Sequence, residues 1–594
     1  MTTENLLEKR FLLGNVIQIA VLTHADAFKG QDVDQYFDLL QQGEAFAATS
    51  LAPLNQSGDE KGASFKKNRI KLPGGYQGAW KKMKKENWHQ IFQSQDTDGK
   101  AIPETLAIAL REIFLAANPS MYYLSAATTL VGQLIKQHGG KQQVDALWGK
   151  LLDFESCGAL ALFEPGDTHH LEFPETVAVH RAEGHYEISG LKERVMGADH
   201  ELTENIIYLL TARIRTENGG EKKMGLLAVP RFLEDGKKQI DNGVRLEGIH
   251  STTGLKAASC SRVSFGDGAE CRGYLLEGLG TDSVAIFKAL NDWYTQLALQ
   301  SVVQTEMAMS DLSHYGKKTE SGSTRSADTF SVRINPTLTH LRSLNEGLRA
   351  TFYTAAFYQD CALHGADSQK EYFSDLLNLY STILTAYAPT QALDLVSKGL
   401  HRNSGLAYAA GSAIERGVRD LQTGVLLGVE ENRAAEMFVD EILPGSGGRL
   451  LGQMLKQFET VDSHQVMSEA LTESIAIWRD YIGGLIVLFG DIINGKNESE
   501  TRISSMFAGL VLKLFGDVIV CYHLIVQGME AERILAEEDA NFYNLKQEVT
   551  NKPELKVWYN KLLLVEYFAV YVLSMQESTI RLIQRNPQAV LEQI

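Results

Sequence analysis

The sequence predicts an α+β fold, in which one block of β strands interrupts a chain that is otherwise helical. Strand-like runs of apolar and β-branched residues, each closed by turn residues, gather between Leu151 and Leu276. Before and after this block, apolar residues recur every three or four positions over long segments, which is the period of a packed helix. At 594 residues the chain is long enough to fold into several domains.

The first 150 residues are expected to form two helical units. Residues 1–70 make an N-terminal extension, for which the pattern indicates an amphipathic helix at Leu6–Ala25, a short helix near Asp34–Gln42 and a polar loop at Asn55–Gly62. Residues 71–150 make a helical domain, because their apolar residues recur at helical spacing.

The middle β domain is expected over residues 151–280. Its first strand is the apolar run Ala159–Phe163, and the segment Glu164–Gly166 ends it, because proline has no backbone N–H to donate and glycine favours a turn. Further strands are expected at Tyr186–Lys192, Asn205–Arg213, Met224–Pro230, Ser261–Phe265 and Arg272–Leu276.

Helices are expected again from residue 281 to the end of the sequence. Residues 281–461 have the apolar period of a helical bundle, and residues 462–594 form a C-terminal helical extension. The longest expected helices cover Val284–Lys317, Thr337–Leu363, Gln369–Ser397, Gln465–Ile493, Thr501–Glu537 and Leu555–Arg585.

The composition argues against several classes of protein. A formal net charge of −17 does not suit a nucleic-acid-binding protein, which needs a basic face. The five cysteines are scattered without a C-x-x-C pair, which is typical of buried thiols in a reducing compartment. The N-terminus carries acidic residues and lacks the basic-then-apolar pattern of a signal peptide, so we expect a cytoplasmic protein.

The most apolar long segment, Met506–Met529, is interpreted as a buried helix. It contains Lys513, Asp517 and His523, and those side chains would be costly at the centre of a bilayer. The sequence therefore predicts no membrane span.

Three short patterns are given structural interpretations. The lysines between Lys81 and Lys85 are expected on a solvated helix face, with contact to the phosphates of a ligand as the alternative. The pair His169–His170 is expected in a surface loop, because no Cys/His cluster lies nearby, and no metal site is predicted. The run Gly445–Gly448 lacks the G-x-G-x-x-G spacing of a dinucleotide site.

Three motifs of the β block carry a family resemblance. Leu162–Pro165 matches a strand end written L-T-E-P, Gly190–Lys192 matches a Gly-Thr-Lys strand, and Gly197–Ile206 follows them. In these motifs the chain resembles the acyl-CoA dehydrogenases, above all the large bacterial members of the 3-methylmercaptopropionyl-CoA dehydrogenase type. The resemblance runs from about Leu72 to the C-terminus. It implies a helical domain, a β-barrel-like middle domain, a helical bundle and an extra C-terminal helical domain.

The resemblance also implies FAD as the cofactor and assigns its contacts to named positions. The family's threonine before Glu-Pro, which hydrogen-bonds the flavin edge, corresponds to Phe163, next to Glu164. The aromatic and hydroxyl pair that follows the Gly-Thr-Lys strand corresponds to Arg194 and Met196. Arg419–Asp420 matches a retained Arg-Asp pair, which we interpret as a structural ion pair or helix cap.

Two further FAD positions lie in the helical bundle. The arginine at the FAD pyrophosphate corresponds to Lys318, which keeps the charge but lacks the bidentate fork of a guanidinium. The glycine-rich turn at the adenosine half corresponds to Ser404, Gly405, Leu406 and Ala407, where side chains narrow the approach of the backbone. Together with Phe163, these positions predict weak or absent FAD binding by the chain alone.

The position of the catalytic base is set by the same resemblance. In this branch the base is a glutamate eight residues after the Arg-Asp aspartate, and a count from Asp420 without a gap places Gly428 there. One residue along a helix turns a side chain by about 100°, so a glutamate at a neighbouring position points elsewhere. Glu430 or Glu431 could therefore replace the base only if the turn shifts by two or three residues.

Two functions remain open on these residues. The first is an FAD-dependent α,β-dehydrogenation of an acyl-CoA thioester, with electron-transfer flavoprotein as the partner. The second is a non-catalytic scaffold or partner subunit that has lost FAD and the base, and that associates with itself or with a paralogous subunit.

Overall fold

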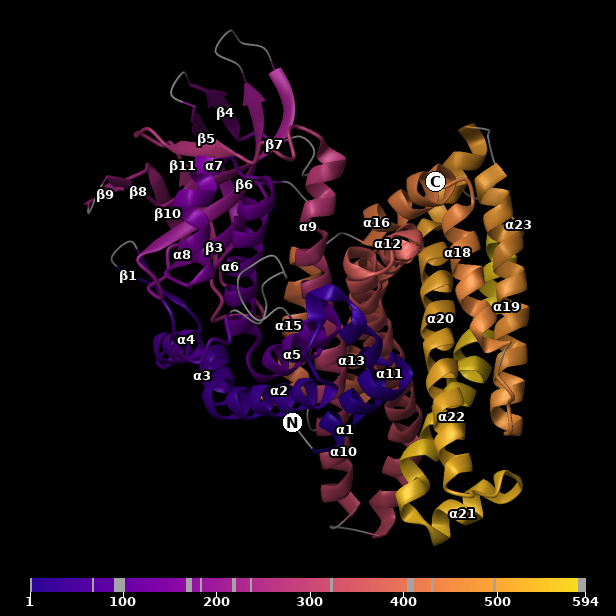
Figure 1. Cartoon of the computed structure of the whole chain (residues 1–594). Coiled ribbons are helices and arrows are strands. Elements are labelled where there is room, and N and C mark those ends of the chain that lie inside the picture. The colour runs from indigo at the N-terminus through magenta and orange to yellow at the C-terminus, as the bar shows by residue number, and fades with distance from the viewer. Residues whose placement is uncertain are drawn as a thin grey trace.

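The computed structural model describes residues 3–66, 69–89, 102–166, 174–181, 184–215, 221–235, 238–320, 324–402, 411–428, 431–462, 464–494 and 498–585. It confirms the predicted α+β fold (Figure 1): a mixed sheet forms one side of the molecule, long helices form the centre, and the C-terminal helices form the opposite side.

The N-terminal helices pack under the sheet and against the central helices. Their bounds are α1 (Thr3–Phe11), α2 (Val33–Phe46), α3 (Ala52–Lys61), α4 (Tyr76–Lys85), α5 (Glu104–Ala117), α6 (Pro119–His138), α7 (Lys141–Gln143) and α8 (Gly149–Leu152). A small hairpin of β1 (Ser64–Lys66) and β2 (Arg69–Lys71) lies between α3 and α4.

One expectation for this region is wrong, since the predicted loop Asn55–Gly62 is mostly the helix α3. Pro53 stands in the first turn, where a missing backbone N–H costs nothing, and Gly58 lets the helix lie against the Tyr76 hydroxyl, which would be 2.3 Å from an added Cβ. The lysine face of α4 is exposed as expected, and Lys84 reaches Glu155 at 3.3 Å.

The middle domain contains the strands β3 (Ser156–Ala161), β4 (Val177–His180), β5 (Tyr186–Met196), β6 (Asn205–Arg215), β7 (Glu221–Pro230), β8 (Phe232–Asp235), β9 (Lys238–Asp241), β10 (Val244–Ile249), β11 (Cys260–Phe265) and β12 (Arg272–Leu275). Eight of them form one sheet in the order β10-β11-β5-β12-β7-β6-β3, and β4 pairs with both β5 and β6. These pairings close β5, β12, β7, β6 and β4 into a ring, so the domain is barrel-like.

The bundle that follows consists of α9 (Ser283–Ala298), α10 (Gln300–Glu320), α11 (Thr324–His364), α12 (Asp367–Thr382), α13 (Ala388–Arg402), α15 (Ala413–Leu427), α16 (Glu431–Met437), α17 (Leu443–Gly445) and α18 (Arg449–Phe458). The C-terminal extension consists of α19 (Glu469–Asn494), α20 (Glu498–Glu537), α21 (Leu545–Asn551), α22 (Lys556–Tyr567) and α23 (Ser574–Arg585), and a π-helical segment, Phe568–Leu573, joins the last two.

The apolar segment of α20 is a core helix. Phe507–Glu537 is long and apolar enough to cross a membrane, but 78% of its most apolar 18-residue window is buried inside the protein. Its buried Asp517 accepts hydrogen bonds from Tyr387 Oη at 2.7 Å and from Lys513 Nζ at 2.8 Å. The interpretation of this segment as a buried helix is confirmed.

Buried ion pairs join the two ends of the chain to the bundle. Glu112 of α5 is paired with Lys9 of α1 at 2.5 Å and with Arg349 of α11 at 3.1 Å, and all three side chains are buried. Lys561 of α22 lies 2.8 Å from Glu346 of α11. The N-terminal and C-terminal extensions are therefore both anchored on α11.

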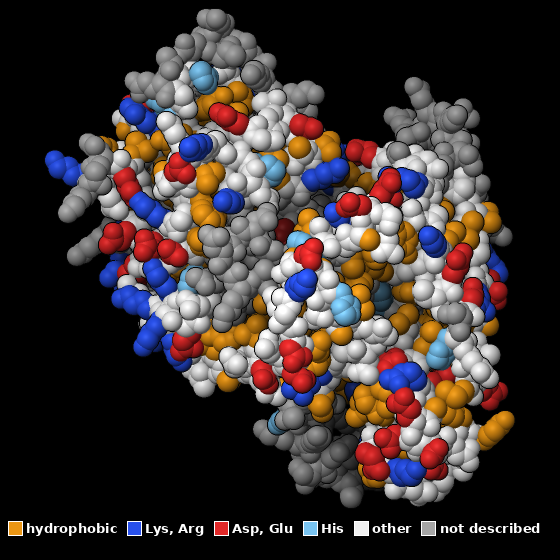
Figure 2. Space-filling view, in the orientation of Figure 1, with side chains coloured by type: hydrophobic (Ala, Val, Ile, Leu, Met, Phe, Trp, Pro, Cys, Tyr) orange, Lys and Arg blue, Asp and Glu red, His pale blue; other side chains and the backbone are white. Residues whose placement is uncertain are grey.

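On the surface, acidic and basic side chains are interspersed over the face that Figure 2 shows.

Candidate functional site

Glu164, which follows β3, is held by the protein and is not free for a ligand. Its carboxylate accepts hydrogen bonds from Lys192 Nζ at 2.7 Å, from the Thr176 amide at 2.9 Å and from the Glu175 amide at 2.5 Å. Burial by itself would raise the pKa of Glu164, but the Lys192 ammonium and the hydrogen bonds outweigh burial and hold the pKa below its ordinary value. Because Lys192 is itself fully buried, the pair fixes the loop after β3 to β5.

A β-bulge in β5 aims the next site residue. Val195 pairs with Ser261 of β11 and Lys192 pairs with Val263, so Glu193 and Arg194 together stand opposite one residue of β11. Arg194 takes φ 54°, in the left-handed region that side chains other than glycine rarely adopt. Such a bulge turns a side chain away from the regular alternation of the strand.

The redirected Arg194 covers Phe163. The guanidinium carbon of Arg194 lies 4.3 Å from the centre of the Phe163 ring, which is a cation–π contact, and the ring is buried. Arg194 Nη1 also donates to the Leu426 carbonyl at 3.3 Å, in the last turn of α15, where carbonyl groups lack helical partners. Met196 is buried in the sheet beside Cys260.

The C-terminal end of α15 places Gly428, the expected position of the base, close to Arg194. Gly428 caps the helix in an extended conformation, two residues beyond the carbonyl that Arg194 binds. It has no side chain, and its amide donates to the Val425 carbonyl at 3.2 Å. Glu430 and the side chain of Glu431 lie outside the described residues. That Gly428 faces an acyl Cα, with no carboxylate in reach, stays a prediction.

The remaining expected FAD positions are not described at the level of side chains. Lys318 lies on α10, but its side chain is outside the description, as are Ser404 and Gly405 after α13. The pair His169–His170 also lies outside the described residues. Within the described part of the chain, no three His, Cys, Asp or Glu side chains gather closely enough to hold a metal ion.

Arg419 and Asp420 join the bundle to the other domains. Arg419 donates to both carboxylate oxygens of Asp59 at 2.7 Å and to the Thr253 carbonyl at 2.8 Å. Asp420 accepts from the Leu255 amide at 2.7 Å, and burial raises the pKa of Asp420 to about 6. These contacts agree with the structural interpretation of the pair. The partner Asp59 carried no signal in the sequence, because it lies 360 positions away from Arg419.

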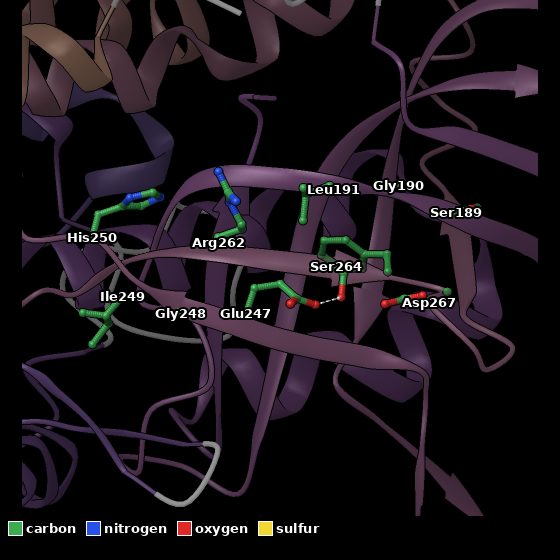
Figure 3. A pocket seen from close by; sticks show the side chains of 12 residues that line it. Ser189, Gly190, Leu191, Glu247, Gly248, Ile249, His250, Arg262, Ser264 and Asp267 are labelled. Carbon is green, nitrogen blue, oxygen red and sulfur yellow. Dashed lines mark hydrogen bonds between the residues drawn. The ribbon is translucent and has the colours of Figure 1, made fainter. Parts of the chain in front are cut away.

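A groove of about 710 Å³ opens on the face of β5, β10 and β11 (Figure 3). Arg262 and His250 lie at one end of it and Asp267 lies at the other, while Ser264 donates to Glu247 at 2.5 Å between them. Arg262 is paired with Glu193, and His250 Nε2 is 4.0 Å from the same carboxylate. The Arg262 guanidinium that lines the groove is thus paired with a carboxylate, which weakens its attraction for a phosphate.

The described residues at the flavin-edge positions do not fit a flavin held as the resemblance implies. A flavin edge needs hydrogen-bond donors, and the side chain of Phe163 has none. The Arg194 guanidinium stacks on Phe163 and donates a hydrogen bond to the Leu426 carbonyl, and the Glu164 carboxylate is paired with Lys192. Of these positions, Arg194 and Phe163 are in contact with each other.

Comparisons with known proteins agree with the resemblance. No family model matches the chain. The chain is 23% identical over 578 residues to the broad-specificity linear acyl-CoA dehydrogenase FadE5 of Mycobacterium tuberculosis, covering 92% of this chain and 94% of that protein. It is 22% identical over 537 residues to 3-methylmercaptopropionyl-CoA dehydrogenase of Ruegeria pomeroyi, covering 87% and 89%.

Solved structures show the same fold over nearly the whole chain. The structure of ACDH-11 from Caenorhabditis elegans in complex with C11-CoA superposes with a TM-score of 0.70 at 15% identity, covering 96% of this chain and 90% of that chain. An acyl-CoA dehydrogenase from Bacillus anthracis complexed with FAD superposes with a TM-score of 0.67 at 14% identity, covering 95% and 93%. In sequence and in fold, the chain resembles the acyl-CoA dehydrogenases over nearly its whole length, at low identity.

Proposed function

We propose that this chain is a non-oxidising member of the family, which keeps the scaffold as a partner subunit and has lost FAD and the catalytic base. The observation that carries this proposal is the contact of Arg194 with both Phe163 and the Leu426 carbonyl. A flavin edge placed there would have to displace a cation–π contact and a charge-assisted hydrogen bond, and it would gain no donor from the Phe163 side chain. Such a subunit would act in the cytoplasm, alone or beside a catalytic paralogue.

The base position supports the same proposal. A general base is worth about 10²–10⁴-fold in rate, and Gly428 offers no group that accepts a proton. A chain without this base and without hydrogen bonds to the flavin would not dehydrogenate an acyl-CoA.

The second candidate is the family's activity, dehydrogenation of an acyl-CoA at the Cα–Cβ bond with FAD. The observation that favours it is the similarity to two dehydrogenases over about nine-tenths of their length. This candidate requires that Glu430 or Glu431 reaches the cleft beside Phe163, and that electron-transfer flavoprotein accepts the electrons.

The deciding experiment is an absorption spectrum of the purified full-length chain, before and after incubation with FAD. We expect a colourless protein whose melting temperature FAD does not change. A yellow protein with one flavin per chain that bleaches with butyryl-CoA or lauroyl-CoA would establish the dehydrogenase. Loss of that bleaching in Glu430→Gln or Glu431→Gln would identify the base.

A gain of function tests the structural reason. The double variant Phe163→Thr, Arg194→Thr removes both members of the contact and supplies a hydroxyl, and each hydrogen bond gained is worth about tenfold in affinity. We expect this variant to bind FAD more tightly than the unchanged chain, as measured by quenching of flavin fluorescence. Arg262→Thr, on the neighbouring strand, is the matched control and should leave FAD affinity unchanged.

A further inference from the structure

The segment from Lys61 to Lys85 is strongly basic in an acidic chain. It contains nine lysines and arginines and no aspartate or glutamate, whereas the whole chain has 74 acidic residues and 57 basic ones. The segment folds into the end of α3, the hairpin of β1 and β2, and the helix α4, which lie together at one edge of the molecule (Figure 1). Over the place of β1 and α4, Figure 2 shows Lys and Arg side chains gathered.

The register of the hairpin places its basic residues on one face. Lys66 pairs with Arg69 and Ser64 pairs with Lys71, so these four side chains point to the same side. Like charges directly opposite each other destabilise a pair of strands. Arg69 has a counter-ion, because its Nε lies 3.6 Å from Asp199. Lys66 and Lys71 are exposed and make no ion pair within the described part of the chain. An anion bound on this face would therefore relieve a repulsion that the hairpin carries.

The helix α4 extends this unpaired charge. The acidic side chains beside it are taken by two of its lysines, in the ion pairs Lys84–Glu155 at 3.3 Å and Lys82–Glu86 at 3.8 Å. Lys81 and Lys85 lie one turn apart on the helix, both are exposed, and neither has an ion-pair partner among the residues that the structure describes. Four lysines without a counter-ion, Lys66, Lys71, Lys81 and Lys85, form what we call the lysine surface.

The composition of the lysine surface selects among anionic partners. Lysine is depleted in interfaces between proteins, where arginine and aromatic residues are enriched. Its ammonium is a point charge on a flexible stem and lacks the rigid fork with which arginine recognises nucleic acids, so it suits phosphates whose positions are not fixed. Phe65, next to Lys66, is 39% exposed, and aromatic rings beside basic residues are typical of surfaces that lie on a bilayer.

We propose that the lysine surface binds this chain to the anionic phospholipids of a membrane, as a peripheral contact that does not enter the bilayer core. This contact does not depend on whether the chain binds FAD. Each lysine near an anionic leaflet adds about fivefold in affinity, so the four together are expected to add roughly 500-fold. Exposed charges more than about 8 Å away are screened at physiological ionic strength, so the acidic remainder of the chain does not cancel this local attraction.

The test is flotation of the full-length chain with vesicles made of equal parts of phosphatidylcholine and phosphatidylglycerol. We expect binding at low salt that weakens as salt is added, and no binding to vesicles of phosphatidylcholine alone. The lysine-surface variant, which should bind roughly 500-fold more weakly, combines Lys66→Gln, Lys71→Gln, Lys81→Gln and Lys85→Gln.

A matched control separates the lysine surface from net charge. The control variant changes four exposed lysines of the bundle and the C-terminal extension, and it combines Lys288→Gln, Lys398→Gln, Lys546→Gln and Lys556→Gln. It lowers the net charge by the same amount and should bind the vesicles as the unchanged chain does. Equal melting temperatures of the two variants exclude an effect on folding.

A fluorescent label tests the place of the contact. The five native cysteines are buried, so a cysteine introduced at the surface can be labelled selectively with an environment-sensitive dye. Labelled Ser64→Cys, on the lysine face of the hairpin, should brighten on the anionic vesicles. Labelled Thr550→Cys, exposed on α21, should not change.

Three results would overturn the proposal. The first is a chain that does not float with the anionic vesicles at low salt, or whose dye brightens at Thr550→Cys and not at Ser64→Cys. The second is binding that the control variant weakens as much as the lysine-surface variant does. The third is binding to a DNA or RNA oligonucleotide that is tighter than binding to the vesicles and is lost in the lysine-surface variant, which would assign the surface to nucleic acid.

Discussion

Replacing Glu164 by glutamine should loosen the β domain while leaving the helical domains folded. The change keeps the shape of the side chain but removes the carboxylate that lies 2.7 Å from the fully buried Lys192 ammonium. Removal of one partner from a buried ion pair costs about 3–5 kcal/mol, because the other charge is left without compensation. The loop after β3 also loses acceptor strength for two backbone amides.

The six tryptophans lie outside the β domain, at Trp80, Trp88, Trp148, Trp293, Trp478 and Trp558, so tryptophan fluorescence would not report this change. Hydrogen exchange of peptides from β3, β5 and β6, followed by mass spectrometry, reports it directly. A loss of about 3 kcal/mol corresponds to exchange that is roughly 100-fold faster. Peptides from α19 and α20 serve as the internal control and should be unchanged.

The effect depends on pH in a defined direction. The pKa of Glu164 is lower in the folded protein than its ordinary value, so the pair stabilises the fold above the unfolded pKa of about 4.3. This contribution disappears as the pH falls through the folded pKa, where the variant and the unchanged chain should converge. The double variant Glu164→Gln, Lys192→Met should recover part of the stability. Exchange in β5 that is unaffected by Glu164→Gln at neutral pH would refute the reasoning.

Two further predictions concern the contacts that join the domains. Asp420→Asn keeps the acceptor for the Leu255 amide and removes a carboxylate whose pKa is raised by burial to about 6. At pH 7.5, where the carboxylate is ionised, the variant should be about 2–3 kcal/mol more stable than the unchanged chain. Near pH 4 the two proteins should be equally stable. Urea unfolding at the two pH values measures this, and equal midpoints at pH 7.5 would contradict it. Glu112→Gln removes the carboxylate that the buried Lys9 and Arg349 share, and it should lower the free energy of unfolding by about 3–5 kcal/mol. The urea midpoint followed by tryptophan fluorescence measures this loss, because Trp558 packs on Phe11 of α1. The exposed Glu60→Gln is its control, and a Glu112→Gln midpoint within error of that control would show that the network is not stabilising.

The sequence by itself determined the class of the fold and its order along the chain. The β block between Leu151 and Leu276 and the helical period on either side follow from local patterns of apolar residues, which arise because each element buries one face or stripe. Local turn residues were a weaker guide. The polar run Asn55–Gly62 has the composition of a loop, but it is helical because Pro53 starts the helix and Gly58 permits its contact with Tyr76.

The resemblance in the sequence pointed to Glu164, Arg194 and Arg419, but only the tertiary structure decided what these side chains contact. Each of them is bonded to a residue far away in the chain: Lys192, Leu426 and Asp59. Pairings of this kind have no period and no spacing in the sequence, because they depend on how separate domains close on one another. The conformation of Arg194 is a further example, since a bulge is set by the register between two strands and not by either strand alone.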